Sequence, residues 1–572
     1  MGPHLPRNPE KPRCLSLGRS TDPRKRQRCE SRSKEGLQPR NRPRCRPRNG
    51  TFPVAFPLRS CHATQANDAR RDRAMAAGYY YERLSALDAS FLGLEDSNCH
   101  MHVGAVSIFD AGPVRTPDGG IDIEKIRSAI HARLHLVPRF RQRIAYIPYE
   151  NHPIWVDDKR FRLAYHVRHT ALPHPGDDRT LKRLVGRIMS QPLDRKRPLW
   201  EMWVVEGLEN DRFALVSKTH HCMVDGISGA DLMSVILSPF PEDDPGVPEP
   251  WTPRPEPTRA QLIVDELVRR AEQPLAAAKA IIDTLRHPEQ RVHQIADAIE
   301  GIIETLAPAF SPVSPTPLQV EVGPHRRFDW TDMSLAEVKE VKRVLGGTVN
   351  DVVLATVSGA LRRFFERRGL NPDELEIRAM VPVSVRAHNE RGHLGNRVTQ
   401  IAAPLPVHIA DPVARLHAVT ETTKDLKESK QALGGEVLTA ISEWTVPNLL
   451  VQAVRLAART RPYNLIVTNV PGPQVPLYLL GAQMRTAYPV VPLFENLGVV
   501  VGLFSYNGGL FWGVNADWEH FPDLHDFILD IEHAFRELQA AAQAQLKRTA
   551  RRRRALKAEP LRLAPREQAT AS

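Results

Sequence analysis

The sequence predicts a mixed α/β protein made of two halves of similar size. Short strand-like runs alternate with amphipathic helical patterns along most of the 572 residues, as in mixed α/β folds. A Pro-rich and helical joint, residues 239–319, separates residues 75–238 from residues 320–545. A chain of this length exceeds what one hydrophobic core usually holds, so we expect each half to be a domain.

In the first half, strand-like runs lead into a turn of unusual composition. Residues 103–109 read as a strand, and residues 123–136 carry apolar side chains at helical spacing. Residues 200–206 and 214–219 are two further strand-like runs. We expect a helix at 228–237, after the turn that follows the last strand.

The joint begins and ends with proline. Residues 239–259 are acidic and Pro-rich, residues 260–306 have a helical apolar pattern, and residues 308–317 are again Pro-rich. Pro274 and Pro288 should kink or divide the helical stretch, because proline lacks the amide hydrogen that a helix interior needs. We therefore expect a bent linker between the two domains.

The second half repeats the alternation of helices and strands. Helices are expected at 335–345 and 350–363, with a long amphipathic helix at 523–543. Asn507-Gly508-Gly509 is typical of a tight hairpin turn. The strand-like runs are 378–385, 399–404, 465–469, 499–506 and 509–515.

The basic character of the chain is confined to its ends. Residues 1–74 hold 19 of the 78 Lys and Arg but only 6 of the 66 Asp and Glu, so the remainder is nearly neutral. Both this leader and the tail 546–572 lack hydrophobic periodicity, and we expect them to be disordered. The leader could instead lie upstream of a true start at Met75. It has no interleaved aromatic residues, so we do not predict nucleic-acid binding.

Cysteine usage and hydropathy indicate a cytoplasmic protein. Outside the leader only Cys99 and Cys222 occur, far apart and without a Cys-x-x-Cys pair, which favours a reducing compartment. No uninterrupted apolar run is long enough to span a bilayer.

The most informative segment is His-His-Cys-Met-Val-Asp-Gly, from His220 to Gly226. The two histidines end a predicted strand, where adjacent side chains point to opposite faces. One imidazole can therefore face a cavity while the other packs behind it. A neutral imidazole can take the proton of an alcohol as a carbon–oxygen bond forms. If the carbonyl that the alcohol attacks is already activated, as it is in a thioester, no covalent intermediate with the protein is required.

Three other interpretations of the histidines compete. They could be structural, although two in tandem before Asp-Gly at a strand end is an uncommon arrangement. They could bind zinc, but no His-Glu-x-x-His pattern supplies further ligands, so we predict no metal. A serine hydrolase would need a Gly-x-Ser-x-Gly nucleophile elbow, which the sequence lacks.

The motif matches the His-His-x-x-x-Asp-Gly signature of the thioester-dependent acyltransferases, which include chloramphenicol acetyltransferase. Within that superfamily, residues 80–545 resemble the bacterial wax ester synthase/diacylglycerol acyltransferase family, particularly the actinobacterial triacylglycerol synthases. The matching segments are Leu84–Leu92, Met101-His-Val-Gly104, Arg197-Pro-Leu-Trp-Glu201, Gly347-Thr-Val-Asn-Asp-Val-Val-Leu354, Met380-Val-Pro-Val-Ser-Val-Arg386, Gly395-Asn-Arg397, Thr468-Asn-Val-Pro-Gly-Pro473 and Pro476-Leu-Tyr478.

The resemblance implies two chloramphenicol-acetyltransferase-like domains with an active-site tunnel between them. It implies that His221 is the general base and that His220 supports it. Asp225, followed by Gly226, would hold the loop by pairing with an arginine, for which Arg386 is our candidate. Asn350 would donate a hydrogen bond to the oxyanion, or would cap a helix, or both.

The resemblance also implies the substrates. Long-chain acyl-CoA would be the donor and co-substrate, with no further cofactor, and diacylglycerol the acceptor. The alternatives are a wax ester synthase that uses a fatty alcohol and a catalytically silent lipid-binding protein of the same fold. We expect reversible binding to a membrane or lipid-droplet surface, carried more by the basic segment 547–554 than by the helix 260–306.

Overall fold

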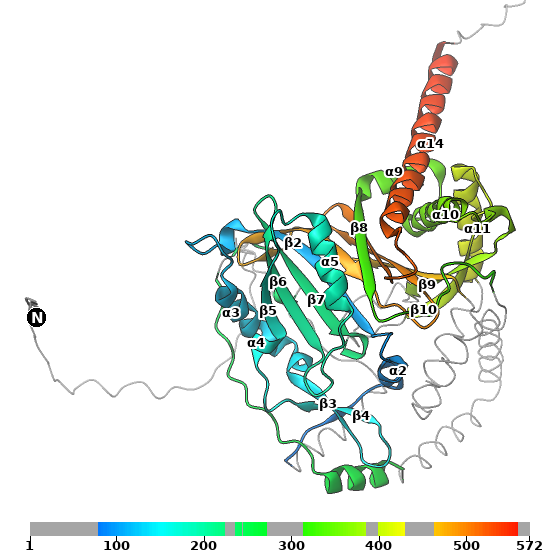
Figure 1. Ribbon diagram of the computed structural model, residues 1–572. Coiled ribbons are helices and arrows are strands. Elements are labelled where there is room, and N and C mark those ends of the chain that lie inside the picture. Colours follow the sequence, from blue (N-terminus) through cyan, green and yellow to red (C-terminus); the bar gives the residue numbers. More distant parts are fainter. Residues whose placement is uncertain are drawn as a thin grey trace, which may run out of the picture. The chain divides into compact units, whose positions relative to one another are not determined.

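The computed structural model describes residues 78–223, 235–242, 244–270, 313–384, 398–428 and 463–558. Their strands form one three-stranded and two six-stranded sheets, and all of them belong to one compact unit, Pro57–Ser572. Figure 1 shows helices beside both large sheets. The predicted mixed α/β class is therefore confirmed.

The first large sheet has the strand order β12-β13-β2-β7-β6-β5. Strands β2 (His102–Asp110), β7 (Arg212–His220) and β6 (Trp200–Leu208) pair antiparallel, and β5 (Val167–Ala171) runs parallel to β6. The three strands predicted in this half are confirmed, each extended by one or two residues at one or both ends.

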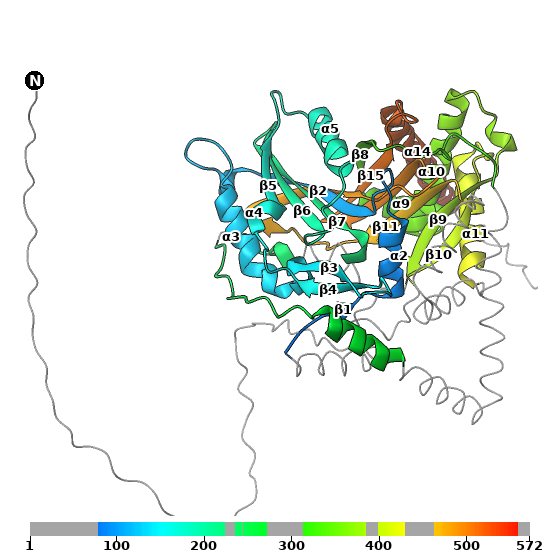
Figure 2. The same cartoon turned by 60° about the horizontal axis from the view of Figure 1, so that its bottom comes forward.

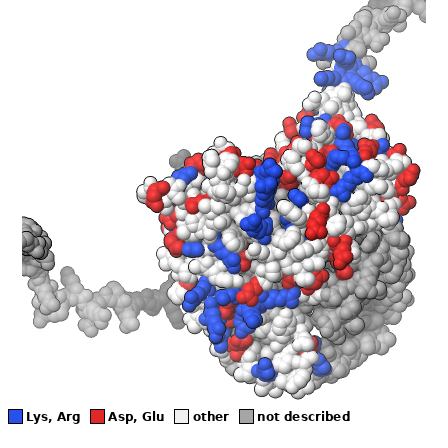
Figure 3. All heavy atoms as spheres, viewed as in Figure 1, with Lys and Arg blue, Asp and Glu red and all other residues white. Residues whose placement is uncertain are grey.

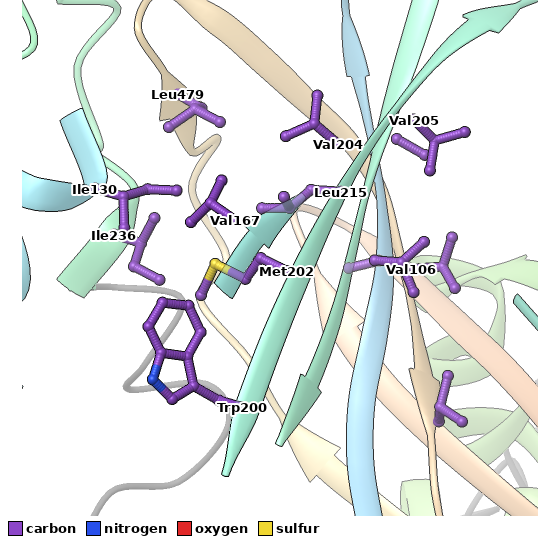
Figure 4. Packing of buried hydrophobic residues seen from close by; sticks show 14 of the residues in the cluster. Val106, Ile130, Val167, Trp200, Met202, Val204, Val205, Leu215, Ile236 and Leu479 are labelled. Carbon is purple, nitrogen blue, oxygen red and sulfur yellow. The ribbon is translucent and has the colours of Figure 1, made fainter. Parts of the chain in front are cut away.

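Buried apolar side chains on both faces of this sheet belong to one continuous core cluster. The fully buried ring of Trp200 belongs to this core, and its indole N–H donates to the carbonyl of Phe140 at 2.9 Å, so its polar group is satisfied. Helix α3 (Ile123–Arg133), which the sequence predicted, covers part of this core. Figure 4 shows part of this cluster, with Trp200, Met202, Val167, Ile130, Ile236 and Leu479 on one side of the strands and Val106 and Val205 on the other.

The second large sheet has the order β10-β9-β11-β14-β15-β8. Its strands are β8 (Arg326–Ser334), β9 (Ile377–Ser384), β10 (Val398–Leu405), β11 (Leu465–Pro471), β14 (Val499–Tyr506) and β15 (Gly509–Asp517). Asn507 and Gly508, with φ of 42° and 84°, form the predicted turn between β14 and β15. All five strand-like runs of this half are confirmed within the described residues, whereas β8 was not predicted.

Helices cover the second sheet on one side. They are α9 (Leu335–Leu345), α10 (Val349–Arg367), α11 (Pro412–Glu428) and α14 (Leu524–Ala558). Apolar side chains of these helices and of the sheet form one buried cluster, with Val357, Phe364 and Leu538 almost fully enclosed. Among the described residues no single helix has the length and apolar composition of a membrane span, and α9 and α10 reach them only as a pair bent by 95°.

A strand from the second half completes the first sheet. Strand β13 (Ala482–Val490) pairs antiparallel with β2, from Val490 opposite Gly104 to Met484 opposite Phe109. The short strand β12 (Tyr478–Leu479) extends this edge. Gly104 lies so close to β7 that a Cβ there would stand 2.0 Å from the carbonyl oxygen of Ser217. The two halves are thus interlocked, which the linear order of the sequence did not indicate.

The start of the linker helix packs on the three-stranded sheet. That sheet consists of β1 (Glu82–Arg83), β4 (Pro153–Asp157) and β3 (Gln142–Tyr146). The helix at 259–270 buries Leu262 against it, and Arg83 forms an ion pair with Glu266 at 2.9 Å. Figure 2 shows this helix, in green, along the sheet. The rest of the predicted helix 260–306 lies outside the described residues.

Helix α14 is longer than the sequence suggested. It continues to Ala558, so the segment 547–554, expected to be part of a disordered tail, is helical. The segment 541–558 is rich in Ala, Gln, Lys and Arg and contains no Gly or Pro, and these residues favour helix even where they bury nothing. Figure 3 shows the Lys and Arg side chains at the far end of this helix.

Candidate active site

The two histidines of the signature lie where β7 ends. His220 is the last residue of β7, and His221 begins the single turn η4 (His221–Met223). Their amides donate to the carbonyls of Leu199 at 2.9 Å and Met101 at 2.7 Å, so the neighbouring chain segments on either side hold both residues. These bonds fix the backbone from which each ring projects.

The ring of His221 is half-buried and stacks on Phe91. The two ring centroids are 4.0 Å apart, and Phe91 belongs to helix α2 (Ala86–Leu94). Burial, helped by the nearby ring of His220, lowers the pKa of His221 to about 4. The imidazole is therefore neutral at pH 7 and able to accept a proton.

Apolar side chains from both halves of the chain surround this position. Phe91 packs against a cluster in which Cys99 and Met101 of the first half meet Ile466, Leu493 and Val500 of the second. His221 therefore stands beside a seam where the two halves of the chain meet. A reaction centre placed at such a seam is shielded from bulk water, which strengthens electrostatic interactions.

His220 is buried behind His221 and has different neighbours. Its Nδ1 accepts a hydrogen bond from the amide of Cys222 at 3.2 Å and lies 3.0 Å from the Cys222 sulfur. Its Nε2 lies 3.5 Å from the carboxylate of Glu95. Burial alone would raise the pKa of Glu95, but contacts with His220 and Arg195 outweigh it and hold the pKa at about 2. The carboxylate is thus ionised at pH 7.

Asn350 lies at the start of α10, and its side chain is held by another amide. Asn469 of β11 donates from Nδ2 to Oδ1 of Asn350 at 2.7 Å. The helix cap is Thr348, which forms a capping box with Asp351. The expectation that Asn350 caps the helix is therefore wrong, because the cap lies two residues earlier.

The structure brings together only part of the predicted set. His220 and His221 adjoin Glu95 and Phe91, while Asn350 pairs with Asn469 and, among the described side chains, makes no hydrogen bond to either histidine. Asp225, Gly226 and Arg386 lie outside the described residues. Within the described ranges, no group of three or more His, Cys, Asp or Glu is arranged to hold a metal ion.

The sequence did not single out Glu95, Phe91 or Asn469. Phe91 and Glu95 stand four positions apart, a spacing that places two side chains on the same face of a helix. Asn469 lies within the Thr468-Asn-Val-Pro-Gly-Pro473 segment already recognised as part of the resemblance. These two signals were available, but nothing in the sequence linked them to the histidines.

Two solved structures of acyltransferases have a similar fold. The structure is similar to that of a wax ester synthase/diacylglycerol acyltransferase from Marinobacter aquaeolei VT8, with a TM-score of 0.60 and 26% identity over 81% of this chain and 99% of that one. A trichothecene 15-O-acetyltransferase from Fusarium sporotrichioides shares the fold, with a TM-score of 0.50 and 11% identity over 81% of this chain and 96% of that one.

Family models and relatives specify the class further. The chain belongs to the wax ester synthase/diacylglycerol acyltransferase family: residues 84–353 match its catalytic domain and residues 394–539 its C-terminal domain. A Mycobacterium tuberculosis protein, provisionally named a diacylglycerol O-acyltransferase, is 34% identical over 80% of this chain and 90% of its own length. Another, also provisionally named so, is 32% identical over 83% of this chain and 98% of its own length. The protein is therefore an acyltransferase, as the sequence predicted.

Proposed function

We propose that this protein transfers a long-chain acyl group from acyl-CoA to the free hydroxyl of a diacylglycerol, with His221 as the general base. The observation that carries the proposal is a neutral, half-buried imidazole at the end of β7, beside an apolar seam between the two halves. The provisional names of the mycobacterial relatives support diacylglycerol as the acceptor.

The proposed reaction is a direct transfer. The imidazole of His221 takes the hydroxyl proton as the acceptor oxygen attacks the thioester carbonyl, and a tetrahedral oxyanion forms. When the oxyanion collapses, the carbon–sulfur bond breaks and the CoA thiolate takes the proton from the imidazolium. Cys222 does not serve as a nucleophile, because burial raises the pKa of its thiol well above the usual value and its sulfur lies against His220.

Asn350 suits the role of oxyanion donor. Its Oδ1 accepts from Asn469, so its Nδ2 group remains the donor side of the amide. An amide held in one orientation stabilises the developing charge without reorganisation during the reaction. We propose that Asn469 fixes Asn350 for this purpose and that Asp225 and Arg386 support the loop.

A competition assay tests the acceptor. Purified protein receives labelled long-chain acyl-CoA with diacylglycerol and hexadecanol together, and triacylglycerol should exceed wax ester. The comparison is needed because the Marinobacter enzyme carries both activities in its name. A dominant wax ester product would make the protein a wax ester synthase, and transfer to neither acceptor by a folded protein would refute both assignments.

We propose that the reaction takes place in the cytoplasm, at the surface of a membrane or lipid droplet. Both the acyl chain and the diacylglycerol partition into lipid, so a chain that works on them must reach that surface. The exposed basic end of α14 supports this proposal, because Lys and Arg are attracted to anionic headgroups.

A further inference from the structure

One acidic side chain lies behind the histidine pair and has no part in the direct transfer described above. Glu95 follows helix α2 and caps it, with its amide donating to the carbonyl of Phe91 at 3.2 Å. Its side chain is 8% exposed and accepts two hydrogen bonds from Arg195, at 2.5 and 3.0 Å. A buried carboxylate with only one cationic partner is costly unless further groups interact with it.

Three imidazoles lie next to this carboxylate. The Oε2 atom that binds Arg195 lies 3.5 Å from Nε2 of His220, and Oε1 lies 3.5 Å from Nε2 of His102 and 3.9 Å from Nδ1 of His100. Within the described residues, Oε1 and these three ring nitrogens form no hydrogen bond. The carboxylate is thus the shared centre of a buried cluster, and His220 is its link to the signature.

The ring of His220 is constrained from both sides. The amide of Cys222 donates to Nδ1, so the proton of a neutral His220 ring belongs on Nε2, the nitrogen that faces Glu95. The distance of 3.5 Å is at the outer limit for a hydrogen bond, and it leaves the Nε2 proton of a neutral ring facing the negative carboxylate. Rotating the ring would lose both contacts.

The same helix also contacts the other histidine. Phe91, one turn before Glu95, stacks on the ring of His221, while Glu95 faces the ring of His220. Helix α2 therefore contacts the two adjacent histidines through two side chains on one of its faces. Because His220 and His221 are adjacent, a backbone change at either residue would displace the ring of the other.

We propose that Glu95 is a positioning residue, which holds His220 in one ring orientation and one tautomer and thereby fixes the place of His221. The inference rests on the proposed role of His221 as the base. Misplacing a base by about 1 Å is enough to slow a reaction by roughly 10²-fold. Glu95 itself touches no reacting atom in this scheme.

The test compares Glu95 with a matched carboxylate elsewhere. Glu266 is also 8% exposed, is also paired with arginines, and also has a pKa held at about 2, but it lies on the linker helix. Glu95→Ala should lower kcat by about 10-fold or more with KM for acyl-CoA changed less than about twofold. Glu266→Ala should lose about as much stability as Glu95→Ala but should have the kcat of the native protein. Glu95→Gln, which keeps an acceptor oxygen, should recover most of the rate.

A spectroscopic measurement tests the proposal without measuring activity. Long-range proton–nitrogen spectra of the histidine-labelled full chain, with His220 assigned by comparison with His220→Asn, should show its neutral proton on Nε2 in the native protein. Glu95→Ala removes one of the two contacts that favour a proton on Nε2, so it should raise the share of the Nδ1 tautomer. A proton on Nδ1 in the native protein, or unchanged kcat in folded Glu95→Ala, would overturn the proposal. If the protein prefers another acceptor to diacylglycerol, kcat of each variant is measured with that acceptor. The spectra do not involve an acceptor, so they test the position of His220 independently of the proposed substrate.

Discussion

At the scale of single residues, the low pKa of His221 governs how the reaction should depend on pH. Burial places this pKa at about 4, so the ring is already unprotonated throughout the neutral range. We expect kcat to be nearly flat between about pH 6 and pH 8 and to fall only as the pH approaches about 4, where the base becomes protonated.

One control makes that pH profile decisive. The unfolding transition is followed at each pH, since the buried rings of His152 and His166 also have pKa values lowered to about 4 by burial. An unfolded chain takes up protons on these groups below about pH 6.5, so stability falls as the pH falls from there toward 4. An acid limb of kcat near pH 6.5 in fully folded protein would contradict the assigned environment of His221.

Removing the ring tests its role directly. His221→Ala should reduce turnover by about 10²-fold or more, because a general base commonly contributes a factor of this size. The folded structure should persist, since His221 is anchored through its backbone amide to Met101 rather than through its ring. Circular dichroism and thermal unfolding check the fold, and near-native turnover by a folded variant would exclude His221 as the base.

The residues that the sequence could reveal are those whose signal is local. His220 and His221 stand out because they are adjacent and end a strand. Glu95 and Asn469 do not, because their contacts join segments far apart in the chain: Asn469 and Asn350 are separated by 119 positions. Such pairings follow from the sheet order, which a single sequence does not show.

At the scale of elements, the end of α14 has the composition of a surface-binding segment. Residues 547–554 are exposed and lie on a helix that projects beyond the second sheet (Figure 1). A helical arrangement concentrates Lys547, Arg548 and the run 551–554 more closely than an extended tail would. Each basic residue near an anionic surface contributes about 1 kcal/mol.

Deleting residues 547–572 should therefore weaken binding to anionic liposomes, and so should replacing the four arginines at 551–554 by glutamine, which keeps the helix. Binding of the intact chain should also decrease between low and high salt, because screening weakens surface attraction. Flotation measures both effects, with neutral liposomes as the control. Equal flotation with neutral liposomes, unchanged by the deletion, would refute the role of this segment.

Elements with continuous apolar runs were predicted within a few residues, whereas others were not. Strand β14, buried at every position, follows directly from its composition. Strand β8 (RRFDWTDMS) and strand β13 (AQMRTAYPV) carry charged residues or proline, which weaken a strand pattern. Their pairing with β15 and β2 supplies the stability that local preference does not.

At the scale of the whole molecule, the place of β13 predicts that the first half is not an independent unit. A fragment spanning residues 75–320 would lack β13 and leave β2 as an unpaired edge that carries the buried side chains Val106 and Ile108. Exposed apolar edges aggregate. We expect this fragment to be insoluble alone and to become soluble when residues 313–572 are produced with it. A soluble fragment with cooperative unfolding would contradict this.

The shared strand also has a consequence for how the chain is made. Strand β2 leaves the ribosome early, but its neighbour β13 is synthesised only after most of the second half; Arg485 and its ion-pair partner Asp110 are separated by 375 positions. The first sheet therefore stays incomplete until most of the second sheet has been translated. Pairing over such a sequence distance is slow, and incomplete sheets are prone to aggregate. Conditions that slow translation or occupy chaperones should thus limit the yield of this enzyme more than its equilibrium stability does.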